Sequence, residues 1–277
     1  MAIITISRGS MSGGEALAQC LAAELGYPCV ARDILVEAAA KLGVSEETLS
    51  KKFEKSPGLW GRLTSDRRLY IIAVQAALIE HARSGDLVYH GHAGHLLLKG
   101  IPSVLRVRLI APLEMRVRAV MERQHLGHDA AAEYIRAVDE DRIRWTKFLY
   151  GLDWRDPSLY DLVINLENMS IKTACVIIRE AVRQPEFETT DAIRRKLEDF
   201  HLGCQVKVAL AANPQTRGIE FEVQVSDGEV DIFGEMPAAG VLMHASRRGE
   251  QEIHKTASAV PGVKVVRIHL REFDAYH

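Results

Sequence analysis

The residues with the clearest chemical potential follow the first apolar run of the chain. Gly9 and Gly14 have the spacing G-x-x-x-x-G, which is typical of a loop whose backbone N–H groups converge on a phosphate at a helix N-terminus. The run Ala2–Ile6 precedes the loop, and the alanine- and leucine-rich segment Glu15–Leu25 follows it. This order predicts a buried strand, a glycine-rich turn and a helix.

The two positions after the loop do not suit this chemistry. Lys and then Ser or Thr usually follow a phosphate-cradling loop, whereas this chain has Glu15 and Ala16. Opposite unit charges about 6 Å apart attract by roughly 3 kcal/mol at an effective dielectric constant of about 20. A carboxylate that faced the phosphate would reverse the sign of this interaction. The direction of the Glu15 side chain therefore decides whether the loop can hold an anion.

Further polar residues stand at the ends of two more predicted strands. Asp33 follows a short second strand, and it is interpreted both as a contact for an acceptor substrate and as a helix N-cap. His90, His92 and His95 stand at the end of a third strand, Leu87–His90. Phosphate or substrate contact, ordinary loop histidines and metal ligands stay open for them. Metal is least favoured because no carboxylate or cysteine completes a set, and no metal site is predicted.

Two predicted helices later in the chain carry charged residues at helical spacing. Arg116 and Arg123 are seven residues apart and share one face of their helix. Asp139 and Arg142 are three apart on the predicted helix Asp129–Trp145 and can pair on one side. A solvated, salt-bridged helix is the usual structural explanation of such a pattern.

Strands alternate with helices over residues 1–184, which predicts an α/β fold with a mostly parallel sheet covered by helices on both faces. The segment 45–63 is interpreted either as a substrate lid or as a surface excursion. The other predicted elements are the helices Ile34–Leu42, Asp66–Ser84 and Ile171–Val182 and the strands Val104–Ile110 and Leu162–Asn165.

The composition shifts at a polar linker, Gln184–Thr190, and residues 190–277 are predicted to form a separate small α+β domain. Asp227-Gly228 is a hairpin turn pattern. The predicted elements of this domain are the helices Asp191–Phe200 and Pro237–Ala259 and the strands Cys204–Ala211, Ile219–Val225, Val230–Phe233 and Val265–Leu270.

Composition narrows the class of protein. The net charge of -2 and the pI near 6.6 give no basic field, so no nucleic-acid partner is predicted. No apolar run approaches the ~18 residues of a membrane span, and the N-terminal run lacks the basic flank of a signal peptide. The four scattered cysteines indicate reduced thiols in a cytoplasmic protein.

In their shared order, several stretches of residues 1–184 resemble the cytidylate kinase-like family of P-loop nucleoside monophosphate kinases. This resemblance implies a P-loop kinase-like parallel sheet. The matching residues are Ile4–Arg8, Ser12–Gly14, Ala31–Leu35, Ala111–Glu114 with Arg116, Met121–Arg123, Asp139 with Arg142, Gly151–Pro157 and Tyr160–Asn165.

The resemblance implies a phosphotransferase with ATP as donor, Mg²⁺ as the metal cofactor bound with ATP, and CMP as the expected acceptor. Asp33, His92 and Arg116 would face the nucleoside monophosphate, and Asp139 and Arg142 would act as a catalytic lid pair. The residues implied to bind ATP are Arg8, Gly9, Ser10, Ser12, Gly13, Gly14 and Glu15.

Two departures from the family pattern support an alternative. Glu15 replaces a cation, and His92 stands where the family usually has Arg. The alternative is a catalytically degenerate protein that senses nucleotides or interacts with partners.

The C-terminal part resembles a BON domain, a small module associated with binding of lipids, small ligands or proteins. The matching residues are Val223–Gly234 and Val260–Val266. In the alternative above, this part would serve as an output or anchoring domain.

Overall fold

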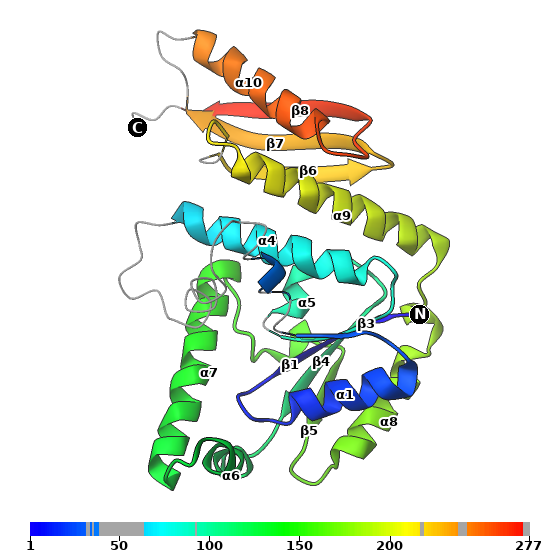
Figure 1. The fold of residues 1–277 in the computed structure, drawn as a ribbon, viewed down its shortest axis with the longest axis vertical. Coiled ribbons are helices and arrows are strands. Elements are labelled where there is room, and N and C mark those ends of the chain that lie inside the picture. The colour runs from blue at the N-terminus through cyan, green and yellow to red at the C-terminus, as the bar shows by residue number, and fades with distance from the viewer. Residues whose placement is uncertain are drawn as a thin grey trace.

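The computed structural model describes residues 1–31, 34, 36–38, 64–91, 93–216, 219–237 and 243–273. They form a five-stranded sheet with helices on both faces and a three-stranded sheet with two helices (Figure 1). Most of the predicted helix Ile34–Leu42 lies outside the described residues. The segment 45–63, with its two interpretations, lies outside them entirely.

The first sheet is fully parallel, in the order β2-β3-β1-β4-β5. This confirms the predicted parallel sheet. Because β1 pairs with both β3 and β4, the loop that follows β1 begins at the centre of the sheet. The strands are β1 (Ile3–Arg8), β2 (Cys29–Val30), β3 (Leu87–His90), β4 (Val104–Ile110) and β5 (Leu162–Asn165).

Helices cover both faces of this sheet: α1 and α8 pack on one face, and α4 and α5 pack on the other (Figure 1). The residue pattern gives no sign of α5, because four residues are too few to show helical periodicity. The helices are α1 (Gly14–Leu25), α4 (Thr64–Ala82), α5 (Gly94–Leu97), α6 (Leu113–Gln124), α7 (His128–Tyr150) and α8 (Ile171–Val182), with short 3-10 turns at Pro157–Leu159 and Pro185–Phe187.

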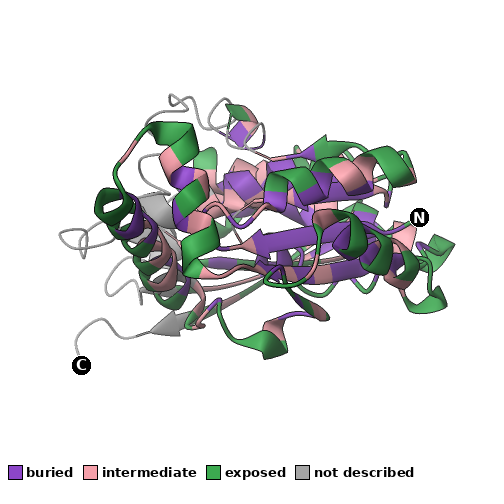
Figure 2. Cartoon of the chain, turned by 90° about the horizontal axis from the view of Figure 1, so that it is seen from below, coloured by how far each residue is buried: buried purple, intermediate pink, exposed green. Residues whose placement is uncertain are grey.

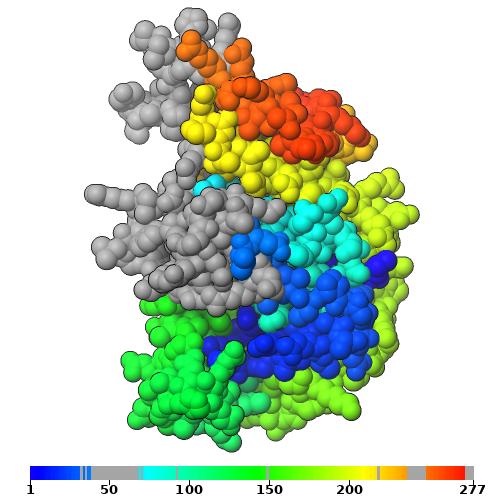
Figure 3. Space-filling view, in the orientation of Figure 1, coloured from blue at the N-terminus to red at the C-terminus, as the bar shows by residue number. Residues whose placement is uncertain are grey.

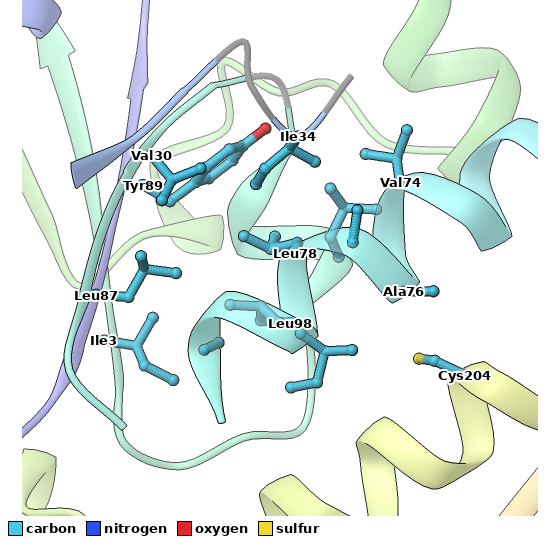
Figure 4. Close-up of a cluster of buried hydrophobic side chains, with 14 of the residues drawn as sticks. Ile3, Val30, Ile34, Val74, Ala76, Leu78, Leu87, Tyr89, Leu98 and Cys204 are labelled. Atoms are coloured by element: carbon cyan, nitrogen blue, oxygen red, sulfur yellow. The ribbon is translucent and has the colours of Figure 1, made fainter. Parts of the chain in front are cut away.

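The core explains why β1 is rich in buried β-branched residues. Ile3 faces α4 and α5, whereas Ile4 and Ile6 face α1 and α8, and none of the three is more than 1% exposed. Each such side chain contributes about 1.5–3 kcal/mol when it is fully buried. Figure 2 shows the buried strands between helices whose outer faces are exposed, and Figure 4 shows strand residues such as Leu87 facing Leu78 of α4.

The second sheet has the order β6-β7-β8, with β6 antiparallel to β7 and β8 parallel to it. Asp227 and Gly228 have φ values of 50° and 81°, as a two-residue type I′ hairpin requires, so the predicted turn is confirmed. The elements are α9 (Asp191–Ala212), β6 (Phe221–Ser226), β7 (Glu229–Pro237), α10 (Met243–Ser258) and β8 (Val265–Phe273).

The strand predicted at Cys204–Ala211 is wrong, because α9 continues through these residues. The helix is buried on two sides: Cys204 and Val208 pack into the core shared with α4, and Val206 and Leu210 pack into the core of the second sheet. Two buried faces on one helix give apolar residues at every second position, the pattern of a strand. α9 accordingly contacts both α4 and β6, and in Figure 3 the yellow residues lie between α4 and the orange and red C-terminal residues.

Candidate functional site

The glycine loop joins the end of β1 to the start of α1. Gly13 has φ 79° and precedes the first residue of the helix, Gly14. Inside the loop, the Ser12 N–H donates to the carbonyl of Gly9 at 3.3 Å. The N–H groups of the first helical turn have no partners within the helix and carry its positive dipole end. The predicted strand, turn and helix are confirmed, and this geometry is suited to an anion.

Two of the glycines make room for arginine side chains. A Cβ at Gly14 would lie 2.7 Å from Cδ of Arg8, and a Cβ at Gly9 would lie 3.0 Å from Cζ of Arg116. Any larger residue at Gly14 would therefore push the Arg8 side chain out of place. Because these two glycines have no side chain, the charged side chains of Arg8 and Arg116 can pack directly against the loop.

Asp139 on α7 links the loop to two arginines. Its Oδ1 accepts a hydrogen bond from the Ser10 N–H at 3.1 Å. Its Oδ2 lies 2.5 Å from Nη2 of Arg116, and its Oδ1 lies 3.7 Å from Nη1 of Arg142. The Asp139 carboxylate therefore accepts a hydrogen bond from a loop N–H group of the kind that would otherwise contact an anion.

The same two arginines also hold the loop backbone. Nε of Arg116 donates to the Ser10 carbonyl at 2.7 Å, and Nη1 of Arg142 donates to the Arg8 carbonyl at 2.9 Å. Met11 has φ 57° and packs against the apolar cluster between α6 and α7. The shape of the loop therefore depends on α6 and α7 as well as on its own glycines.

The site has a surplus of positive charge. Three guanidinium groups, those of Arg8, Arg116 and Arg142, surround the loop with Asp139 as their carboxylate. Burial and the neighbouring Arg8 lower the pKa of Arg142 to about 10, and burial also lowers the pKa of Arg8. Because like charges held this close repel, the cluster favours a bound anion.

The Glu15 side chain reaches Arg123 on α6, and its charge also acts on Arg8. This side chain is 60% exposed, and its Oε2 lies 3.8 Å from Nη1 of Arg123, which is also exposed. An exposed ion pair of this length contributes little energy, but it partly neutralises the carboxylate. Glu15 therefore does not block the loop, although it remains in the lining of the adjoining cavity.

Two cavities meet at the loop. The larger, named here the loop cavity, has a volume of about 1010 Å³ and is lined by residues 8–16, with Tyr89 and Arg123 among others. The smaller, the aromatic cavity, has a volume of about 370 Å³. The lining of the aromatic cavity includes His95, Tyr134, Trp145, Tyr150 and Trp154. Arg8, Ser10, Gly91, Tyr134 and Arg142 line both cavities.

His95 is held neutral in the wall of the aromatic cavity. Burial, followed by the charges of Arg106 and Arg108, lowers its pKa from 6.5 to about 4. Between these values the unfolded chain binds a proton that the folded chain does not, so the free energy of unfolding falls as the pH is lowered from 6.5 to 4.

We expect this linkage to remove about 3 kcal/mol of stability over that pH interval. Urea unfolding at a series of pH values measures it, with His95→Gln as the variant that lacks the titrating group. The variant should lose correspondingly less stability than the wild type as the pH falls. Equal pH dependence in the two proteins would contradict a neutral, buried His95.

The structure brings together most of the residues predicted from the sequence. Asp139 joins Arg116 and Arg142 at the loop, and Arg116 and Asp139 line neither cavity. Ser12 is buried, and its Oγ has no partner among the described residues. The substrate contacts predicted at Asp33 and His92 lie outside the described residues.

Other candidate residues were not found by sequence reasoning. No group of three or more potential metal ligands occurs within the described part of the chain, so His90 and His95 do not form part of one there. Tyr134 and Trp145 line the cavities without any spacing pattern that marks them, and Trp154 lies in the matching stretch Gly151–Pro157 without a role having been expected for it. In the described ranges, none of the helices has the length and apolar character that a membrane crossing needs.

The sequence matches a known protein family and known enzymes. The model of the cytidylate kinase-like family matches residues 3–168. The cytidylate kinase of Ignicoccus hospitalis is 31% identical over 168 residues, which cover 60% of this chain and 90% of that enzyme. The cytidylate kinase of Methanopyrus kandleri is 30% identical over 190 residues, which cover 68% of this chain and 96% of that enzyme.

A solved structure shows the same fold. An uncharacterized protein from Eubacterium ventriosum matches with a TM-score of 0.50 and 18% identity, over 66% of this chain and 98% of that protein. At this identity, the likeness concerns the fold alone.

Proposed function

Because the chain belongs to the cytidylate kinase-like family, we propose that it transfers a phosphoryl group from ATP to a nucleoside monophosphate, with CMP as the preferred acceptor. The observation that carries this proposal is the position of Arg8 and Arg142, which line both cavities. A phosphoryl group that moves from one cavity to the other passes these two guanidinium groups. The curated relatives are named cytidylate kinases, which supports CMP.

The loop cavity is the proposed place of ATP. Its lining combines the loop backbone, the start of α1, and the side chains of Arg8 and Arg142, a set suited to a triphosphate. Mg²⁺ fits this set less well, because Ala16 offers no oxygen where a phosphate-binding loop usually has a hydroxyl. Glu15 and Glu122 are the carboxylates in the described lining, and phosphate oxygens would supply the other ligands.

The aromatic cavity is the proposed place of the acceptor. In the proposed reaction, an oxygen of the acceptor phosphate bonds to the γ-phosphorus of ATP. The bond from this phosphorus to the β–γ bridging oxygen breaks, and that oxygen leaves with ADP and keeps the electron pair. Such a transfer needs positioning and charge neutralisation more than covalent help. Arg8 and Arg142 are assigned this neutralisation, and Asp139 positions Arg116 and Arg142.

A coupled assay of ADP formation tests the proposal. The full chain is incubated with ATP and Mg²⁺ together with CMP, UMP, AMP or GMP, one at a time. We expect turnover that depends on the monophosphate and is fastest with CMP. A folded protein that forms no ADP with any of the four monophosphates would contradict the kinase proposal.

The alternative function is a nucleotide-binding protein that does not transfer phosphate. It is favoured by Glu15 and Ala16 and by the Asp139 carboxylate, which holds a loop N–H group. A rise in melting temperature with ATP, in the absence of turnover, would support this sensor. A protein that responds to no nucleotide would leave only a role in interactions.

Reversing the charge at Glu15 measures how much this carboxylate weakens the binding of ATP to the loop. We expect Glu15→Lys to tighten ATP binding by about tenfold, because the side chain is exposed and its charge is screened. Calorimetric titration with ATP provides the measurement. Glu133→Lys, an exposed site on α7, makes the same change in net charge and should have little effect.

Equal effects of Glu15→Lys and Glu133→Lys would show that only the net charge matters. Binding of ATP by Glu15→Lys but not by the wild type would show that the protein is a catalytically degenerate member of the family.

For the C-terminal part, we propose a BON-like binding module comprising residues 190–277. Its resemblance in sequence supports this, together with a core of its own between α9, α10 and the second sheet. Binding of the full chain to vesicles of anionic phospholipid tests a lipid ligand. Co-sedimentation is the expected result, and none at any lipid concentration would contradict a lipid ligand.

A further inference from the structure

The aromatic cavity contains unpaired polar atoms. Both ring nitrogens of His95, Nε1 of Trp154 and Nε of Arg142 are buried without a hydrogen-bond partner among the described residues, and all three side chains line this cavity. His95 is 5% exposed and Trp154 is 6% exposed. Folded proteins leave few buried polar groups unpaired. Three such side chains line one cavity, and a polar ligand bound there would supply the missing partners.

Neighbouring side chains hold the two rings in position. The ring of His95 lies 4.6 Å from that of Tyr160, and the Tyr160 hydroxyl donates to the Trp154 carbonyl at 2.7 Å. The guanidinium group of Arg108 stacks 4.8 Å from the centre of the Trp154 ring. His95 comes from α5, and Trp154 comes from the segment between α7 and β5. The polar atoms are therefore preorganised, which lowers the entropy that a ligand loses on binding.

The unpaired atoms define what the ligand must offer. The Trp154 indole can only donate a hydrogen bond, whereas a neutral imidazole donates from one nitrogen and accepts at the other. Tyr134, Trp145 and Tyr150 add aromatic rings to the same lining, and aromatic rings favour planar ligands. A flat ring whose edge carries both hydrogen-bond acceptors and a donor meets these requirements, and a nucleobase has such an edge.

We propose that His95 and Trp154 bind the edge of the acceptor's nucleobase in the aromatic cavity and thereby determine which nucleoside monophosphate is used. This inference rests on the proposed kinase function and adds the residues that select its acceptor. Arg142 then lies on the side where this cavity meets the loop cavity, in keeping with an acceptor phosphate directed toward ATP.

Two conservative variants of the full chain test the inference. Trp154→Phe keeps an aromatic ring but removes the N–H group. His95→Leu replaces the imidazole by an apolar side chain of similar size and so removes both ring nitrogens. Removing one such hydrogen bond should weaken CMP binding by about tenfold in each variant. The affinity for ATP should stay within about twofold, because ATP occupies the other cavity. Calorimetric titrations with CMP and with ATP measure both affinities.

Steady-state kinetics add a second readout. Both variants should raise the KM for CMP more than they lower kcat, and the preference for CMP over UMP should decrease. His95→Gln, whose amide both donates and accepts, should recover part of the CMP affinity and also serves if His95→Leu does not fold. Ser103→Ala is the control, because the Ser103 hydroxyl is equally buried and unpaired but lies outside both cavities.

The outcomes separate this inference from the function on which it rests. If the wild type uses CMP, and Trp154→Phe and the histidine variants bind and use CMP as the wild type does, the inference is overturned and the kinase proposal stands. If the wild type binds ATP but none of CMP, UMP, AMP and GMP, both are overturned.

Discussion

Replacing Arg142 by alanine should lower kcat for phosphoryl transfer by about 10³-fold, the low end of the range for an arginine that neutralises a transferring phosphoryl group. The guanidinium group of Arg142 lines both cavities, and its side chain is only 16% exposed. Its charge is therefore weakly screened at the place where negative charge spreads over the transferring group. The coupled assay with ATP and CMP measures the loss.

Two further variants make this prediction specific. Arg142→Lys keeps the charge but not the planar guanidinium, and it should retain more activity than Arg142→Ala. Arg144 is an exposed arginine on the same helix and pairs with Asp141 and Glu140. Arg144→Ala should leave kcat unchanged. If Arg142→Ala keeps wild-type kcat, phosphoryl transfer does not occur at the boundary between the two cavities.

Replacing Asp139 by alanine should lower the free energy of unfolding by about 2–3 kcal/mol. The change removes the acceptor of the Ser10 N–H and the carboxylate that lies next to Arg116 and Arg142. The repulsion between the remaining guanidinium groups is then no longer offset. Urea unfolding of the wild type and the variant measures the difference.

ATP should raise the free energy of unfolding of Asp139→Ala by more than it raises that of the wild type. The phosphate groups supply the negative charge that Asp139 provided, and ligand binding stabilises the folded state in proportion to its affinity. Glu140→Ala removes an exposed neighbouring carboxylate and should cost less than about 1 kcal/mol. A stability loss in Asp139→Ala no larger than that in Glu140→Ala would show that the carboxylate does not hold the cluster together.

Local patterns were sufficient to predict the first sheet and its loop. Strands β1 and β3 are rich in buried apolar residues because parallel strands are covered on both faces, and glycines at positions 9 and 14 mark the turn into α1. The pairing of Asp139 with Arg142 also follows from their spacing on one helix. These features depend on neighbours within a few residues, which a single sequence displays.

The rest depends on contacts between residues far apart in the chain. Arg116 and Arg142 bind loop carbonyls 106 and 134 residues away, and no spacing rule relates such positions. The Glu15 side chain lies beside Arg123 on α6, a contact that the residues next to Glu15 in the sequence do not reveal. The helix α9 was mistaken in part for a strand because it is buried between two cores.

The central claim is that the glycine loop and its arginines hold the phosphate groups of a nucleotide. Calorimetric titration of the full chain with ATP and Mg²⁺, at low and at high salt, tests this claim most directly. The account predicts one ATP per chain, weaker binding at high salt because the contacts are charged, and loss of binding in Arg8→Gln. Absence of binding heat with any nucleoside triphosphate, at low salt and over a range of temperatures, would contradict it.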